Sequence, residues 1–248
     1  MSDKRLRWFM SRRPGAVEAV LSRSFGGSQT PYDWLARSVS ASARNVLVVV
    51  AGAGGMVERL AADGRFVVGL DWSESAIREA HRRGRDRMVQ ADANYLPFGP
   101  ETFDAVVSEL GLAVNENREL MLAEIARVLR PGGMFAGMAP SMRPVNVEDA
   151  RSIATLARQL RVTPHLPGET EFRATPLLVG AGLQKAEDAR AKFYFDVRGR
   201  DDAEVLVGGL RATDEVERAR HTVNYLAERS KQRPVRVPLP MRRILAIK

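Results

Sequence analysis

Short apolar runs alternate with amphipathic segments through the first 140 residues. Continuous apolar runs at 46–50 and 66–70 predict strands buried on both faces. Apolar residues at helical spacing predict helices over 56–63 and 120–129, and Ser73 is a candidate N-cap for another. Further strands are expected at 87–91, 103–108 and 134–138. This alternation favours a parallel sheet built from right-handed crossovers.

The pattern weakens after Pro140. Helices are expected over 147–160, over 175–182 and twice within 201–225, with strands at 192–197 and 235–247 and a loop at 163–170. Neither a repeat nor a low-complexity linker interrupts the chain, so a single domain is expected. Its parts would be an N-terminal helical cover (1–44), a ligand-binding half (45–140) and a region that completes the sheet (141–248).

Composition narrows the class of protein. Of the 248 residues, 45% are hydrophobic and 27% are charged, which is typical of a globular protein. The absence of cysteine excludes disulfides, thiolate metal sites and cysteine nucleophiles. Without an apolar run near the roughly 20 residues that a bilayer requires, or a signal-peptide core, we expect a cytoplasmic protein with no membrane association.

The formal net charge of +8 is concentrated at the two ends of the chain. Residues 1–13 hold five bases and one acid, and residues 229–248 hold seven bases and no acid. Basic ends bind nucleic acid by releasing counterions. The other interpretation is that both ends are simply solvated, and nothing in the sequence specifies an oligomer.

Candidate chemistry lies where the first three predicted strands end. Gly52-Ala53-Gly54 follows the first strand and leaves backbone amides open to a polar ligand. Asp71 ends the second strand, where a carboxylate accepts from ribose hydroxyls, unless it only caps a helix. Asp92 follows the third predicted strand. The three strand ends are expected to converge on one adenosine-sized cleft. A dinucleotide fingerprint would need its third glycine at Val57, so a dehydrogenase is the lesser interpretation.

Four segments resemble the class I S-adenosylmethionine-dependent methyltransferases, in particular the type 11 small-molecule group. They are residues 46–55, 67–73, 89–98 followed by 103–107, and 127–133, the last reading Arg-Val-Leu-Arg-Pro-Gly-Gly. The resemblance covers roughly residues 45–140. It implies a Rossmann-like α/β fold: a doubly wound, mostly parallel seven-stranded sheet with helices on both faces. It also implies S-adenosylmethionine as cofactor.

The same resemblance assigns roles to particular residues. Asp71 would hold the ribose diol, Trp72 would pack on adenine, and Asp92 would accept from the adenine amino group. The amide of Ala93 would reach a ring nitrogen, and Ser108 would border the methionine end; Gly52, Ala53 and Gly54 would wrap the donor. Two plainer interpretations remain open: Trp72 covering core and Asp92 capping a turn. Residues 32–36 resemble the family's N-terminal helix that covers the cofactor.

Two expected residues of the first motif are missing. The interval from Gly54 to Asp71 puts Val50 where the family has its first glycine and Val48 where it has an acid. A side chain at Val50 narrows the methionine site, and the lost carboxylate removes a polar anchor. Weaker donor binding, a different ligand and an inactive scaffold all follow as alternatives.

No strong catalytic constellation is present. Methyl transfer from a sulfonium depends largely on positioning, so a base is not obligatory. His165 and Glu109 are weak candidates for a catalytic base, and the alternative is that both are solvated surface groups. The sequence shows no spacing typical of metal ligands. The sequence thus favours methyl transfer from S-adenosylmethionine to a small-molecule acceptor whose pocket residues 141–230 would shape. A catalytically weak or inactive regulatory protein and, from the basic end, an RNA methyltransferase are the alternatives.

Overall fold

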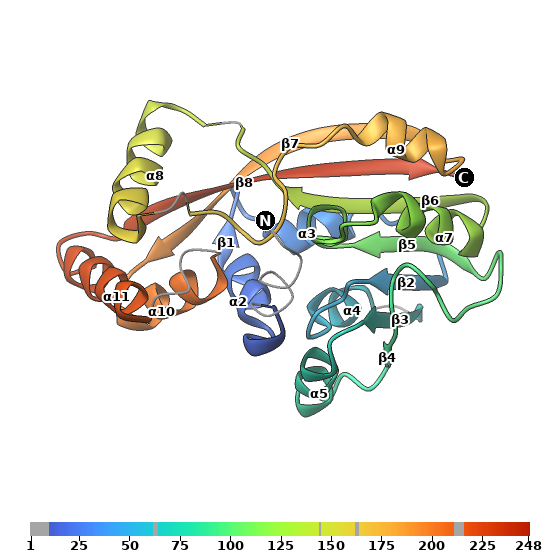
Figure 1. The fold of residues 1–248 in the computed structure, drawn as a ribbon, viewed down its shortest axis with the longest axis horizontal. Coiled ribbons are helices and arrows are strands. Elements are labelled where there is room, and N and C mark those ends of the chain that lie inside the picture. Colours follow the sequence, from blue (N-terminus) through green and yellow to red (C-terminus); the bar gives the residue numbers. More distant parts are fainter. Residues whose placement is uncertain (1–9, 62–63, 144, 162–163, 211–215) are drawn as a thin grey trace.

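A computed structural model describes residues 10–61, 64–143, 145–161, 164–210 and 216–248 (Figure 1). Its strands form one sheet of eight, in the order β1-β7-β8-β6-β5-β2-β3-β4. The basic residues 1–9, and Asp63 and Thr163 at the edges of expected elements, lie outside the described residues. In chain order the described strands are β1 Ser24–Phe25, β2 Asn45–Val49, β3 Phe66–Asp71, β4 Met88–Gln90, β5 Phe103–Ser108, β6 Leu129–Pro140, β7 Gln184–Val197 and β8 Val235–Ile247.

The parallel part of the sheet corresponds to the predicted first half. Strand β2 pairs with β3 on one side and with β5 on the other, Val48 lying opposite Gly69 and Val107. Strand β4 extends this part beyond β3, and β6 extends it beyond β5. Because the chain order reverses between β2 and β5, the carboxyl ends of these strands frame a crevice of the kind that binds ligands in open α/β sheets.

The second half adds antiparallel strands. Strand β8 pairs with both β6 and β7, and β7 pairs with β1. The predicted strands at 134–138 and 192–197 are longer in the structure, because β6 begins at Leu129 and β7 begins at Gln184. The two-residue β1 is the strand that raises the expected seven to eight. The α/β fold with a mostly parallel sheet is confirmed.

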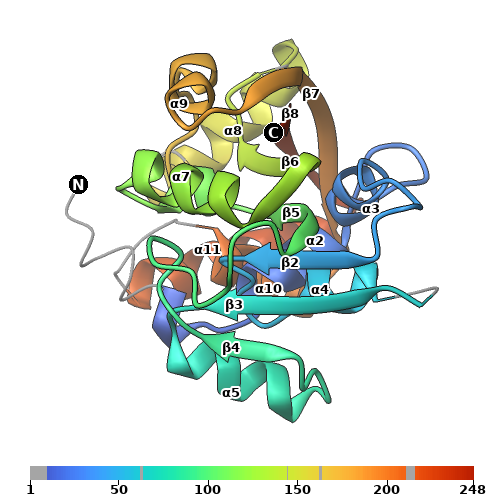
Figure 2. The same ribbon diagram turned by 90° about the vertical axis from the view of Figure 1, so that its right-hand side faces the viewer.

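Helices cover both faces of the sheet (Figure 2). Along β2, Val46 and Val48 belong to one buried cluster, and Leu47 and Val49 belong to the other. The first cluster packs beneath α2 Ala16–Ser22, α3 Pro31–Ala36, α4 Gly55–Leu60, α5 Glu74–Arg82, α8 Val147–Leu160, α10 Arg200–Gly209 and α11 Val216–Ser230. The second packs beneath α6 Gly111–Val114, α7 Arg118–Val128 and α9 Ala174–Gly180.

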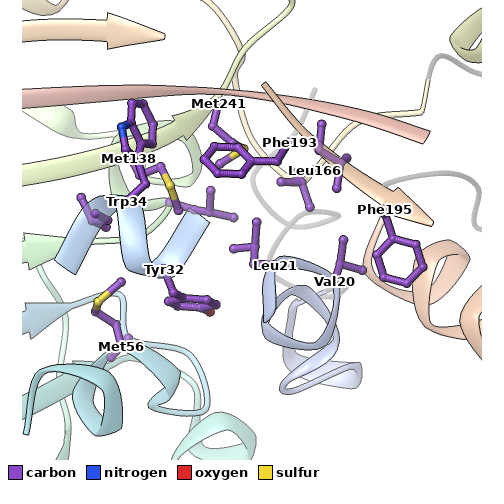
Figure 3. Close-up of a cluster of buried hydrophobic side chains, with 14 of the residues drawn as sticks. Val20, Leu21, Tyr32, Trp34, Met56, Met138, Leu166, Phe193, Phe195 and Met241 are labelled. Carbon is purple, nitrogen blue, oxygen red and sulfur yellow. The ribbon is translucent and has the colours of Figure 1, made fainter. Parts of the chain in front are cut away.

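The N-terminal helices pack into the larger cluster. Figure 3 shows Leu21 of α2 and Tyr32 of α3 in the same apolar cluster as Met56 of α4. Helix α3 begins with a capping box, in which Thr30 accepts from the amide of Asp33 at 3.1 Å. The predicted cover segment at 32–36 is therefore a helix of the core, and the N-terminal region is built onto the sheet.

The basic end of the chain is not a tail. Residues 235–247 form β8, between β6 and β7 in the sheet. Five of the seven bases in 229–248 form ion pairs with acidic side chains: Lys231, Arg236, Arg242, Arg243 and Lys248. The expectation of a free basic tail is wrong, because the segment is a strand of the sheet whose three arginines pair with acidic residues of β7.

Among the described residues, no helix is both long enough and apolar enough to span a membrane.

Candidate functional site

A cleft of about 1060 Å³, part of it open to solvent, lies at the carboxyl ends of the parallel strands. Its walls come from the segments that follow β2, β3, β4 and β5, and from residues 10–18 with Tyr32 above them. Gly52, Asp71 and Asp92 all line it, which confirms the predicted convergence of three strand ends. The described lining residues end at Glu116, so the assignment of 141–230 to an acceptor pocket stays a prediction.

The turn after β2 has an unusual backbone. Gly52 and Gly54 have φ of +53° and +83°, and Val50 has φ of +54°. The left-handed region is readily open to glycine and costs a β-branched residue free energy. Val50 therefore holds a conformation that a glycine would adopt without this cost, and it lines the cleft.

Asp71 is fixed at the centre of the cleft by two backbone amides. Its Oδ2 accepts from the amide of Gly52 at 2.8 Å, and its Oδ1 accepts from the amide of Ser73 at 2.9 Å. The side chain is 4% exposed, and burial raises the pKa of Asp71 to about 6. These contacts orient the carboxylate and also join the turn after β2 to the end of β3.

The expected adenine contacts also lie in the cleft. Trp72 is 37% exposed, and Asp92 and Ala93 line the cleft beside it. Asp92 Oδ1 accepts from the amide of Asn94 at 2.9 Å, so this carboxylate does shape its own turn. A side-chain bond of 3.1 Å from Asn115 to Asn94 holds that turn against the segment after β5.

Three residues singled out in the sequence are not among the cleft's lining. Ser108 is fully buried, and its hydroxyl donates to the carbonyl of Val49 and accepts from the amide of Gly111, so it braces the strand ends from behind. Gly54 faces away, because a Cβ there would meet the Arg85 side chain at 3.1 Å. His165 lies in a separate apolar hollow beside Pro140 and Pro238, so the structure does not bring it to the cleft.

Glu109 does line the cleft, and it is not a solvated surface group. It is 7% exposed, and its Oε2 accepts from the Tyr32 hydroxyl at 2.7 Å. Its Oε1 accepts from the amide of Met56, in the first turn of α4, at 3.3 Å. Burial raises the pKa of Glu109 to about 8 and the pKa of Tyr32 well above its usual value. Sequence reasoning missed the Tyr32 partner, which is separated from Glu109 by 77 residues.

An arginine network that the sequence did not reveal anchors α2 over the cleft. Arg85 pairs with both carboxylate oxygens of Glu18, at 2.9 and 2.8 Å, and donates to the carbonyl of Ala53 at 2.6 Å. Glu18 belongs to α2 and lines the cleft. The guanidinium of Arg85 therefore links helix α2 to the turn after β2 and fixes their relative position.

Among the described residues, no group of three or more histidine or acidic side chains is arranged to hold a metal ion.

Comparison with known proteins finds a family match in the part of the chain that builds the cleft. The model of a methyltransferase domain matches residues 47–137, which run from β2 into β6 and carry most of the strand ends around the cleft. The matched part of the chain is therefore similar to a methyltransferase domain, and it contains Gly52, Asp71 and Asp92.

Individual relatives extend the match beyond that domain. A demethylmenaquinone methyltransferase of Clavibacter sepedonicus is 34% identical over an alignment of 157 residues, which covers 56% of this chain and 64% of the relative. A phthiotriol/phenolphthiotriol dimycocerosates methyltransferase of Mycobacterium leprae is 29% identical over 181 residues, covering 62% and 67%. The aligned part of the first relative is therefore just under two thirds of its length.

Solved structures share the fold of this chain at low identity. A SAM-dependent methyltransferase from Aquifex aeolicus superposes with a TM-score of 0.51 and 15% identity, over 76% of this chain and 92% of the other. Likeness at this identity concerns the fold alone. It agrees with the eight-stranded sheet and the two helical layers described above.

Proposed function

We propose that this chain transfers the methyl group of S-adenosylmethionine to a small, lipophilic acceptor. The observation that carries the proposal is the convergence of Gly52, Asp71 and Asp92 on one cleft, where polar groups from three strand ends meet an apolar wall. The match to a methyltransferase domain, and the similarity to a demethylmenaquinone methyltransferase and a phthiotriol/phenolphthiotriol dimycocerosates methyltransferase, support both the reaction and the acceptor class.

The residues present fit the donor. Asp71 offers a buried carboxylate to a ribose diol, and at Gly52 an added Cβ would meet no atom within 4 Å, so the backbone is open to the ligand. The half-exposed Trp72 ring offers an apolar face to a purine, and Asp92 and the Ala93 amide offer edge-directed polar groups. Apolar walls from Val17, Leu110 and Val114 suit a lipophilic acceptor better than a polyanion.

The chain's contribution to the reaction is positioning. The donor, when bound, supplies an electrophilic methyl group, which moves to a nucleophilic oxygen, nitrogen or carbon while the sulfur keeps the bonding electron pair. The fixed turn at Gly52 and the anchored α2 hold the two reactants in one orientation and limit access of water. Of the two candidate bases, Glu109 is at the cleft and His165 is not.

The test is methyl incorporation from isotopically labelled donor. The full chain is incubated with a demethylated quinol, a long-chain phenol or hydroxylated lipid, and an unmodified RNA, and each acceptor is recovered and counted. Label in the quinol, phenol or lipid supports the proposal. Label in the RNA alone, or donor binding with no transfer to any lipophilic acceptor, would refute the acceptor class. Absence of donor binding would favour the inactive scaffold.

A further inference from the structure

This inference rests on the proposed function and concerns the acid that the first motif lacks. We propose that Glu109, from the neighbouring strand, takes the place of that acid and holds the positively charged methionine end of the donor. The family resemblance places an acid at position 48, where this chain has a valine. Val48 is fully buried in the core, with 0% of its surface accessible, and it does not line the cleft.

The register of the sheet puts Glu109 on the same face as Val48. Val48 lies opposite Val107 in the pairing of β2 with β5, and both belong to the same buried cluster. Since side chains alternate along a strand, a residue two positions after Val107 projects to that face. Glu109 does so, because its carboxyl contacts Tyr32 and Met56 of the helices on this face.

The local contacts prepare Glu109 for a cationic ligand. Its two oxygens accept from the Tyr32 hydroxyl and the Met56 amide, and these hydrogen bonds fix the orientation of the carboxyl group in the wall of the cleft. Among the described residues, no arginine, lysine or histidine forms an ion pair with it. A buried carboxylate without a cation is unfavourable, so a bound ammonium or sulfonium would gain from this pairing.

The charged groups around Glu109 add to this preference. Glu18 from α2 and Asp71 from the end of β3 both oppose its ionisation. The Arg85 guanidinium faces this group of residues, but it is already paired with Glu18 and Glu58. The inner cleft therefore attracts positive charge, which an S-adenosylmethionine carries at both its sulfur and its amino group.

The chemistry predicts proton release when the donor binds. Burial keeps the pKa of Glu109 at about 8 in the free protein, so the carboxyl is mostly protonated at pH 7. A cation beside it favours the carboxylate. Binding at pH 7 is therefore expected to release close to one proton, and donor affinity is expected to rise about tenfold between pH 6 and pH 7, where the donor's own amino group stays charged.

The test is calorimetry of S-adenosylmethionine binding at pH 7, in two buffers that differ in ionisation enthalpy. The full chain is compared with Glu109→Gln and with Glu119→Gln, a matched control on the exposed first turn of α7. Glutamine mimics the protonated acid and retains an oxygen acceptor, so the variant should fold. We expect the wild type and Glu119→Gln to release about one proton, and Glu109→Gln to release none and to bind at least about tenfold more weakly at pH 9.

A second variant tests the positioning by Tyr32. Its hydrogen bond lowers the pKa of Glu109, so Tyr32→Phe should move the midpoint of the affinity profile to higher pH. Equal proton release by the wild type and Glu109→Gln would overturn the inference while leaving the proposed function intact. The inference would also be overturned if Glu109→Gln left the dissociation constant of S-adenosylmethionine unchanged but lowered kcat at saturating donor, because Glu109 would then act as a base. No donor binding by the wild type at any pH would instead refute the proposed function.

Discussion

At the scale of single residues, the turn after β2 holds a valine in a backbone conformation that favours glycine. Val50 has a φ of +54°, which costs a non-glycine residue about 1–2 kcal/mol. Val48 lies in the apolar core, so a carboxylate restored there would be buried without a partner. The informative restoration is therefore at Val50, where the backbone already suits glycine.

We expect Val50→Gly to be more stable than Val50→Ala by about 1 kcal/mol. Both variants lose the contacts of the two γ-methyl groups, but only glycine, which also lacks Cβ, relieves the left-handed conformation. The free energy of unfolding in urea measures the difference. Val205, inside helix α10, provides the control pair, since alanine should there exceed glycine in stability by a similar amount. The same order at both sites would contradict the strain at Val50.

At the scale of elements, the long strand β8 ties the two halves of the sheet together through paired arginines. Arg242 is 5% exposed and donates to both oxygens of Asp188, at 2.8 and 2.6 Å, and to the carbonyl of Phe172 at 2.7 Å. Arg236 makes a similar bidentate pair with Asp196, but its side chain is 64% exposed. Because the first pair is buried and the second is exposed, we expect the two ion pairs to contribute unequally to the free energy of unfolding.

Arg242→Ala is expected to lower the free energy of unfolding by about 3 kcal/mol or more, because it leaves Asp188 and a buried carbonyl without their donor. Arg236→Ala should cost less than about 1 kcal/mol, since water replaces the lost partner. Denaturant unfolding of the two variants side by side measures both. Losses of equal size would show that burial does not govern these pairs.

Prediction from sequence succeeded where one element carries its own pattern. The buried strands 46–50 and 66–70 and helix 147–160 could be read from periodicity, and Gly52, Asp71 and Asp92 from their places at strand ends. It failed where the decisive partner is remote. The strand at Ser24–Phe25 exists only through pairing with β7, the Tyr32 to Glu109 bond spans 77 residues, and the charges of β8 are matched by β7.

At the scale of the whole molecule, two groups of acids pull stability in opposite directions with pH. Burial raises the pKa of Glu109 to about 8 and that of Asp71 to about 6. Hydrogen bonds from arginine hold the pKa values of Asp188 and Asp196 below their usual range. Folding therefore favours the protonated form of Glu109 and Asp71, and it favours the ionised form of Asp188 and Asp196.

The unliganded protein should therefore be less stable at pH 8 than at pH 5. Unfolded Glu109 releases its proton near pH 4.5 and folded Glu109 near pH 8, so the unfolded state binds fewer protons between these values and stability falls as pH rises. Below about pH 4 the arginine-paired acids reverse the slope. Unfolding free energies at a series of pH values measure the profile. Glu109→Gln should flatten the decline above pH 5, and an unaltered decline in that variant would assign it to other groups.

The account as a whole depends on an adenosine-containing donor entering the cleft between Gly52, Asp71 and Asp92. Calorimetric titration of the full chain with S-adenosylhomocysteine tests this directly, because the product analogue binds without turnover. We expect saturable binding of one ligand per chain, with affinity reduced at least about tenfold when Asp71→Ala removes the ribose acceptor, a loss of roughly 1.4 kcal/mol. No binding at ligand concentrations up to about 1 mM, a limit of roughly −4 kcal/mol, would contradict the account.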